Sequence, residues 1–139
     1  MDRKDSTKGK STAYPATVTL AATWNENLAY QYGKALGRDC RARNINVILG
    51  PAVNIYRAPM CGRNFEYMGE DPYLTSRICV GYIKGVQDQG VMATVKHFVA
   101  NNSDYDRNNI SNDIDERTLN EIYFPAYKAA IQEAEVGPS

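Results

Sequence analysis

Residues 46–51 read NVILGP and residues 91–99 read VMATVKHFV, and these two apolar runs set the expected fold class. Each run contains β-branched residues and leads into Gly, Pro or polar residues, which predicts a short buried strand. A third strand is expected over residues 16–22 (ATVTLAA), behind Pro15. Because no hairpin turn lies between the runs, we expect parallel strands that are joined through helices.

The segment after the strand expected over residues 16–22 has the pattern of a long amphipathic helix. We predict this helix over residues 24–44, opened by a capping box of Thr23 and Glu26. Trp24 lies in the first turn and is expected to be buried rather than to stack on a ligand. The expected apolar stripe consists of Leu28, Tyr32, Ala35, Leu36 and Ala42.

Two more helices are expected, one after the apolar run at residues 46–51 and one after the run at residues 91–99. Asp71-Pro72 gives an N-cap followed by proline at the first helical position, and Gly90 supplies the C-terminal stop. The last helix begins at Asp113 or Asp115, and Pro125 marks a kink or a break in it. The alternation of strands and helices predicts an α/β fold with about three βα units and right-handed crossovers.

Composition limits the classes of partner. The chain has 139 residues, with 16 Lys and Arg balancing 16 Asp and Glu, so no basic excess favours nucleic acid or an anionic membrane. No apolar run approaches the roughly 18 residues of a membrane span. Residues 1–12 are expected to form a polar tail or loop and contain no signal peptide. The location therefore stays open between the cytoplasm and the periplasm.

Metal and cofactor sites are not indicated. The three cysteines, Cys40, Cys61 and Cys79, form no CxxC pair, and His97 is the only histidine. The spacing fits neither a zinc ribbon nor a disulfide framework. We therefore expect no metal and no cofactor.

Polar side chains are concentrated in two long loops, residues 50–70 and 100–112. Both loops follow carboxyl ends of expected parallel strands, the edge at which such folds bind ligands. The many donors and acceptors there suit a polyhydroxylated ligand. They are Asn54, Arg57, Arg63, Asn64, Glu66 and Glu70, and then Lys96, His97, Asn101, Asn102, Asp104, Asp106 and Arg107.

Three motifs in order give a resemblance to a known family. They are GRNFE with EDP inside residues 50–76, KHF inside VKHFVANN at residues 95–102, and DIDERTLNEIYFPAYKAA at residues 113–130. Together they resemble the N-terminal domain of glycoside hydrolase family 3, the β-glucosidase type, from about Tyr14 to Val136. The resemblance implies a (β/α)8 TIM-like barrel packed against an α/β sandwich domain, of which residues 13–139 would be a partial barrel, a fragment.

The resemblance also implies roles for individual residues. Arg63, Lys96 and His97 would bind hydroxyls of the sugar in subsite −1 of a metal-free, retaining, exo-acting glycosidase. From the residue types alone, Arg57 and Glu66 are expected to support the loop. For Glu66, a salt bridge to Arg63 that only holds the loop and a direct part in the site both stay open. Charged donors in fixed geometry suit sugar hydroxyls.

Lys96 and His97 are adjacent in the chain, which limits how both could contact one sugar. Neighbouring side chains of a regular strand point to opposite faces. We therefore predict that the backbone leaves strand geometry between residues 96 and 98, by a bulge or an unusual peptide.

No catalytic residue is assigned within the chain. Retaining glycosidases need two carboxylates about 5 Å apart, and the resemblance implies a nucleophile in a Ser-Asp-Trp or Ser-Asp-Tyr motif that closes an apolar strand. Residues 103–105 have the letters Ser-Asp-Tyr but lie in a polar loop without such a strand. We expect the nucleophile and the acid/base to lie outside these 139 residues, and the isolated chain to be inactive.

The expected partners are a β-linked glucoside or related oligosaccharide, the remainder of the barrel and the second domain. Two other function classes stay open. One is a non-catalytic carbohydrate-binding or assembly fragment that pairs with its missing half or with itself, through exposed strand edges. The other is a phosphate site at Arg57, Arg63 and Lys96, against which stands the lack of a Gly-rich phosphate loop.

Overall fold

The computed structural model describes residues 12–135. Residues 1–11 of the expected polar tail lie outside this range. The elements run in the order α1 (Thr17–Ala21), α2 (Glu26–Ala42), β1 (Val47–Ile48), the 3-10 turn η1 (Asn64–Glu66), α3 (Pro72–Gln87), β2 (Met92–Ala93), α4 (Glu116–Thr118), the π-helical turn η2 (Leu119–Tyr123) and α5 (Phe124–Glu133).

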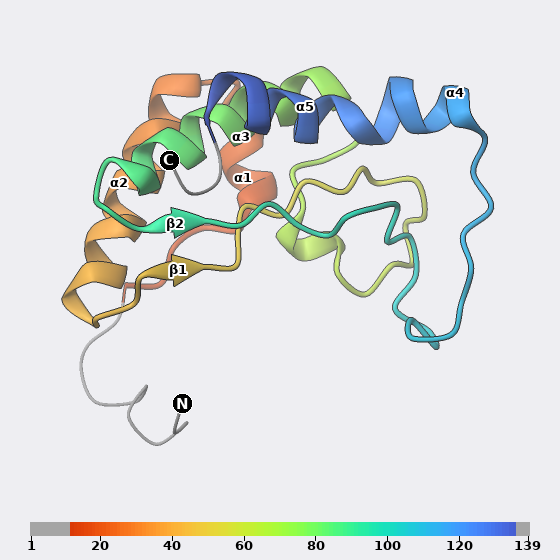
Figure 1. Ribbon diagram of the computed structural model, residues 1–139, viewed down its shortest axis with the longest axis horizontal. Helices are drawn as coiled ribbons and strands as arrows, with labels where there is room; N and C mark the ends of the chain where they lie inside the picture. Colours follow the sequence, from red (N-terminus) through yellow and green to blue (C-terminus); the bar gives the residue numbers. More distant parts are fainter. Residues whose placement is uncertain (1–11, 136–139) are drawn as a thin grey trace.

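The two strands form a parallel sheet, as expected. Val47 pairs with Met92, and Ile48 pairs with Ala93. The strands are shorter than the apolar runs, but the two backbone segments stay side by side as far as a parallel bridge between Ala52 and Lys96. In Figure 1 the helices α2, α3 and α5 lie on one side of the sheet, and the long loops extend beyond the ends of the strands. The coarse prediction of an α/β fold with parallel strands is confirmed.

The expected strand over residues 16–22 is wrong, because this segment forms α1. Leu20 and Ala21 are buried in the core, while the Thr17 hydroxyl donates to the carbonyl oxygen of Glu66 at 2.5 Å. Thr17, Leu20 and Ala21 share one face of a helix, whereas in an extended segment Leu20 would point away from Thr17 and Ala21. The tertiary contacts thus outweigh the β-propensity of the threonines and the valine.

Helix α2 differs from its expected cap and face. Asn25, not Thr23, is the N-cap, and its side chain accepts from the Leu28 amide at 2.9 Å. Trp24 is 73% exposed, which corrects its expected burial. The fully buried positions of α2 are Ala29, Gly33, Gly37 and Cys40, while Leu28 and Ala42 of the expected stripe are exposed.

The later helices follow the sequence signals closely. Asp71 caps α3 by accepting from the Leu74 amide at 2.7 Å, and Pro72 is its first residue. Of the two candidate caps for the last helical segment, Asp115 accepts from the Thr118 amide at 2.9 Å. The expected break at Pro125 takes the form of the π-helical turn η2 directly before α5.

The core lies between the sheet and α2, α3 and α5, and its largest buried side chains include Ile78, Ile83 and Val86 of α3. The other face of the sheet is uncovered, since Val47 and Met92 are exposed while Ala93 is buried. Among the helices within residues 12–135, none is both long and apolar enough to cross a bilayer.

Candidate functional site

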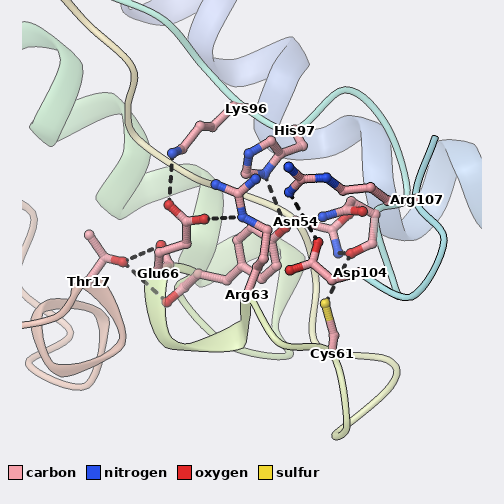
Figure 2. Close-up of polar contacts among 11 residues, drawn as sticks. Thr17, Asn54, Cys61, Arg63, Glu66, Lys96, His97, Asp104 and Arg107 are labelled. Carbon is pink, nitrogen blue, oxygen red and sulfur yellow. Dashed lines mark hydrogen bonds and ion pairs between the residues drawn. The ribbon is translucent and has the colours of Figure 1, made fainter.

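Glu66 joins the 50–70 loop to the segment that follows β2 by binding two cations. Its Oε1 accepts from Arg63 Nε at 2.5 Å, and its Oε2 lies 2.8 Å from Lys96 Nζ. Arg63 directly precedes the 3-10 turn η1 and Glu66 is its last residue, and their side chains meet three positions apart. Figure 2 shows Glu66 between the two cations. The carboxylate therefore fixes an arginine and a lysine that are 33 residues apart in the sequence.

The Lys96 backbone is held by the neighbouring segment that follows β1. Its carbonyl oxygen accepts from the Val53 amide at 2.7 Å, and its own amide donates to the Pro51 carbonyl oxygen at 3.0 Å. Directly after this contact the backbone leaves strand geometry, with cis peptide bonds at Lys96–His97 and Phe98–Val99. The predicted departure from a regular strand between residues 96 and 98 is confirmed.

His97 faces a buried tyrosine that the sequence had not singled out. Tyr67 Oη lies 3.1 Å from His97 Nδ1, and the two rings meet edge to face with centroids 5.9 Å apart. Tyr67 Oη also accepts from Asn101 Nδ2 at 3.0 Å. The available signal for this contact was the tyrosine that directly follows GRNFE, because a buried phenol needs hydrogen-bond partners. Its partners lie 30 and 34 residues away, and the sequence did not reveal them.

Asn54 links the two loops from beneath. It is almost fully buried, and its Nδ2 donates to the Asn101 carbonyl oxygen at 3.1 Å and to Asn102 Oδ1 at 3.3 Å. Asn102 in turn donates to Tyr123 Oη at 2.7 Å. This set of amide contacts fixes the start of the 100–112 loop against the 50–70 loop.

The charges set the protonation of the site. Burial alone would raise the pKa of Glu66, but hydrogen bonds from Lys96 and Arg63 outweigh it and hold the pKa below its usual value. Burial lowers the pKa of His97, and the cations Arg63 and Lys96 lower it further. At neutral pH the site therefore contains a carboxylate, two cations and a neutral imidazole.

A hollow of about 370 Å³ lies beside this network, within the size range of small-ligand sites. Arg63 and His97 line it together, whereas Lys96 and Glu66 do not; Lys96 is linked through Glu66 to Arg63. The 100–112 loop contributes Arg107, which ion-pairs with Asp104 at 3.7 Å. A larger hollow of about 760 Å³ lies at the opposite, amino end of β2 and contains none of the expected site residues.

The remaining expectations have different outcomes. Arg57 is exposed, and its guanidinium makes no ion pair or hydrogen bond with any residue in 12–135, so its loop-supporting role stays a prediction. Asp104 lies in the irregular part of the 100–112 loop, directly before the turn at residues 105–109 and away from any strand end. Within the described residues, no three His, Cys, Asp or Glu side chains are grouped as a metal site would require.

Comparison with known proteins identifies what this arrangement is similar to. The chain is 55% identical over 126 residues to β-glucosidase BoGH3A of Bacteroides ovatus, covering 91% of this chain and 17% of that protein. It is 48% identical to thermostable β-glucosidase B of Acetivibrio thermocellus, covering 89% of this chain and 16% of that protein. The chain thus spans about a sixth of the length of these relatives.

A solved structure supports the same relationship. The structure of β-glucosidase 3B from Thermotoga neapolitana in complex with α-D-glucose matches 97% of this chain and 19% of that chain, with a TM-score of 0.90 and 42% identity. Residues 3–138 match the family description "Glycosyl hydrolase family 3 N terminal domain". The chain therefore belongs to glycosyl hydrolase family 3.

Proposed function

We propose that the chain supplies part of the −1 sugar subsite of a retaining, exo-acting, β-glucosidase-like enzyme. Arg63, Lys96 and His97 bind hydroxyls of the non-reducing terminal glucosyl unit of a β-linked glucoside or related oligosaccharide. The observation that carries this proposal is Glu66, which ties Lys96 to Arg63, and Arg63 lines a hollow together with His97. Fixed cationic donors next to a hollow suit hydroxyl recognition.

The relatives support the choice of ligand. Several are named β-glucosidases, and the Thermotoga neapolitana protein was solved in complex with α-D-glucose. Within this chain, the hollow has polar side chains from both loops, which fits a hydroxylated ligand better than an apolar one.

We propose that the isolated chain does not hydrolyse glycosides. Glu66 is ion-paired with two cations and its pKa is lowered, so it stays ionised and cannot serve as a general acid. Asp104 lies in an irregular loop segment, where a nucleophile would be poorly held. The carboxylate pair would come from residues outside this chain, in the remaining barrel and the second domain.

The first experiment measures glucose binding to the 139-residue chain by chemical-shift changes in its NMR spectrum. Glucose should shift the side-chain signals of Arg63 and His97. Arg63→Ala should abolish those shifts, while Arg57→Ala should keep them, because both arginines lie in one loop but only Arg63 reaches the hollow. Circular dichroism checks that both variants fold. Equal responses from the two variants would contradict the subsite.

The second experiment tests activity with an aryl β-glucoside. The chain should show no turnover above background. Robust turnover that disappears in Asp104→Asn would overturn the assignment of the nucleophile to another part of the protein.

A second candidate function, assembly, is favoured by the uncovered side of the sheet. Val47, Leu49 and Met92 are 46%, 70% and 40% exposed and lie at or next to β1 and β2. We propose that further barrel strands cover this face and its free edges in the longer protein, and that a second copy covers them when the chain is isolated. Light scattering tests whether the chain self-associates through it, and Leu49→Lys should then reduce the association. A monomer at every concentration would contradict self-pairing.

A further inference from the structure

Tyr67 lies behind His97 and is fully buried. Its hydroxyl group has two polar neighbours, Asn101 Nδ2 at 3.0 Å and His97 Nδ1 at 3.1 Å. The three groups form a continuous line that begins in the 100–112 loop, passes through the 50–70 loop and ends at the imidazole.

The direction of the protons along this line follows from counting donors. A side-chain amide nitrogen can only donate, so Asn101 donates to the phenol oxygen. A phenol has one proton, and among residues 12–135 His97 Nδ1 is the acceptor within its reach. If Nδ1 carried a proton instead, the buried phenol proton would be left without a partner, so Nδ1 is the acceptor in the favoured arrangement. Burial raises the pKa of Tyr67 to about 12, so the phenol keeps its proton at neutral pH.

We propose that Tyr67 is a positioning residue that fixes His97 as the neutral tautomer with its proton on Nε2. With Nδ1 occupied by Tyr67, Nε2–H is the donor that His97 can offer to a ligand in the hollow. No acceptor among residues 12–135 engages Nε2. Only the naming of that ligand as a sugar hydroxyl rests on the proposed function; the tautomer does not.

The charges around His97 act in the same direction. From the 50–70 loop, Arg63 and Glu66 face the imidazole, Lys96 precedes it, and Asp104 faces it from the 100–112 loop. Arg107 lines the same hollow. Burial lowers the pKa of His97, and the repulsion from Arg63 and Lys96 exceeds the attraction from Glu66 and Asp104. The imidazole therefore remains neutral at pH 7.

This charge environment has a consequence for stability. Because the folded state lowers the pKa of His97 below the 6.5 of the free side chain, the folded state binds fewer protons than the unfolded state as the pH falls. The stability that the neutral imidazole contributes is present above about pH 6.5 and is lost as the pH decreases. An NMR titration should give a pKa below that of the same histidine in urea.

The direct test is a long-range ¹H–¹⁵N correlation spectrum of the ¹⁵N-labelled chain at pH 7. His97 is the only histidine, so the imidazole signals need no assignment. We expect the pattern of one unprotonated nitrogen at Nδ1 and one protonated nitrogen at Nε2. The Nδ1–H pattern, or that of an imidazolium, would overturn the proposal.

Two variants test whether Tyr67 is responsible. Tyr67→Phe keeps the ring but removes the donor, so the spectrum should move to a mixture of tautomers and the pKa of His97 should rise. Asn101→Asp replaces the donor by an acceptor, so the phenol should donate to the new carboxylate and His97 should shift towards the Nδ1–H form. An unchanged tautomer in both variants would overturn the proposal.

Tyr56→Phe is the matched control. Tyr56 packs edge-on against Tyr67, with centroids 6.3 Å apart, and its hydroxyl bonds to the Asn64 carbonyl oxygen rather than to His97. This variant should keep the wild-type tautomer. Adding glucose separates the two proposals: a fixed Nε2–H tautomer without a glucose response contradicts the sugar site alone, while a glucose response on an Nδ1–H imidazole contradicts the role of Tyr67 alone.

Discussion

The contacts inside the helix pair α2–α3 differ in kind from the contacts inside the loop site. In the helix pair, glycines let the two backbones touch. A Cβ added at Gly85 of α3 would overlap the carbonyl oxygen of Tyr30 on α2, and one added at Gly33 of α2 would overlap that of Tyr82 on α3. In the loop site, the contacts are between polar side chains, with Glu66 and Tyr67 at the centre.

This difference sets how each region responds to change. Backbone atoms in close contact cannot move away from an added methyl group without shifting a whole helix. A polar network on loops can lose one partner and still keep its fold, but the partners that remain are left unsatisfied. The helix pair is thus sensitive to volume and the loop site to charge and to hydrogen-bond direction.

The largest effect is expected from Gly85→Ala. Alanine is normally the better helix former, by about 0.5–1 kcal/mol, so propensity alone would stabilise α3. The overlap with the Tyr30 carbonyl oxygen, and a Cβ placed 2.7 Å from the Lys34 amide nitrogen, outweigh this gain. We expect a net loss of about 3 kcal/mol in the free energy of unfolding, measured by urea denaturation.

Gly62→Ala is the control for this change in the loop site. A Cβ there would lie 3.4 Å from Asp104 Oδ2, an ordinary van der Waals contact. The expected change is within about 0.5 kcal/mol of zero. Equal losses from the two variants would contradict the proposed difference between the regions.

An intermediate effect is expected from Glu66→Gln. The substitution keeps the shape of the side chain but removes the charge that Arg63 and Lys96 share, and the Glu66 side chain is only 18% exposed. We expect a loss of about 1–2 kcal/mol in the free energy of unfolding. The glucose-induced shifts of His97 should weaken as well, because the two cations are no longer fixed.

Glu121→Gln is the matched control for the loss of charge. Glu121 pairs with Arg117 on the surface, where the two side chains are 58% and 83% exposed. Such a pair contributes about 0.5 kcal/mol or less. If both glutamines cost the same, Glu66 is only another surface ion pair, and its central place in the site is wrong.

The sequence revealed those parts of the fold that depend on local signals. Asp71-Pro72 fixed the start of α3, and the two apolar runs gave both strands and their parallel arrangement. The helix expected over residues 24–44 is confirmed as α2, but its buried face was not predicted, because that face consists of small residues such as Gly33 and Gly37, which an apolar pattern does not count. The sequence failed for α1, whose form depends on contacts with Glu66 and the core.

For the site, the motifs pointed to Arg63, Lys96 and His97, which the structure places close together, with Arg63 and Lys96 on Glu66 and His97 on Tyr67; their roles as sugar ligands stay a prediction. Glu66 appeared in the sequence as a partner of Arg63 alone, while the structure adds Lys96 as a second partner. Tyr67 was missed, because a hydrogen bond between residues 30 positions apart leaves no periodic signal. Pairings of this kind need the folded chain, since the loops are brought together by the parallel sheet and by long-range contacts such as those of Asn54 and Tyr67 with Asn101.

The smallest effect, and one of opposite sign, is expected from Trp24→Gly between α1 and α2. Trp24 has φ of 54°, in the left-handed region, and its side chain is 73% exposed. A residue with a Cβ loses roughly 1–2 kcal/mol in this conformation, whereas glycine does not; the greater freedom of glycine in the unfolded chain offsets about half of the gain. Trp24→Gly should therefore raise the free energy of unfolding by about 0.5 kcal/mol. Trp24→Ala keeps the Cβ and should give no gain. If the two variants are equally stable, the left-handed conformation of Trp24 contributes no strain.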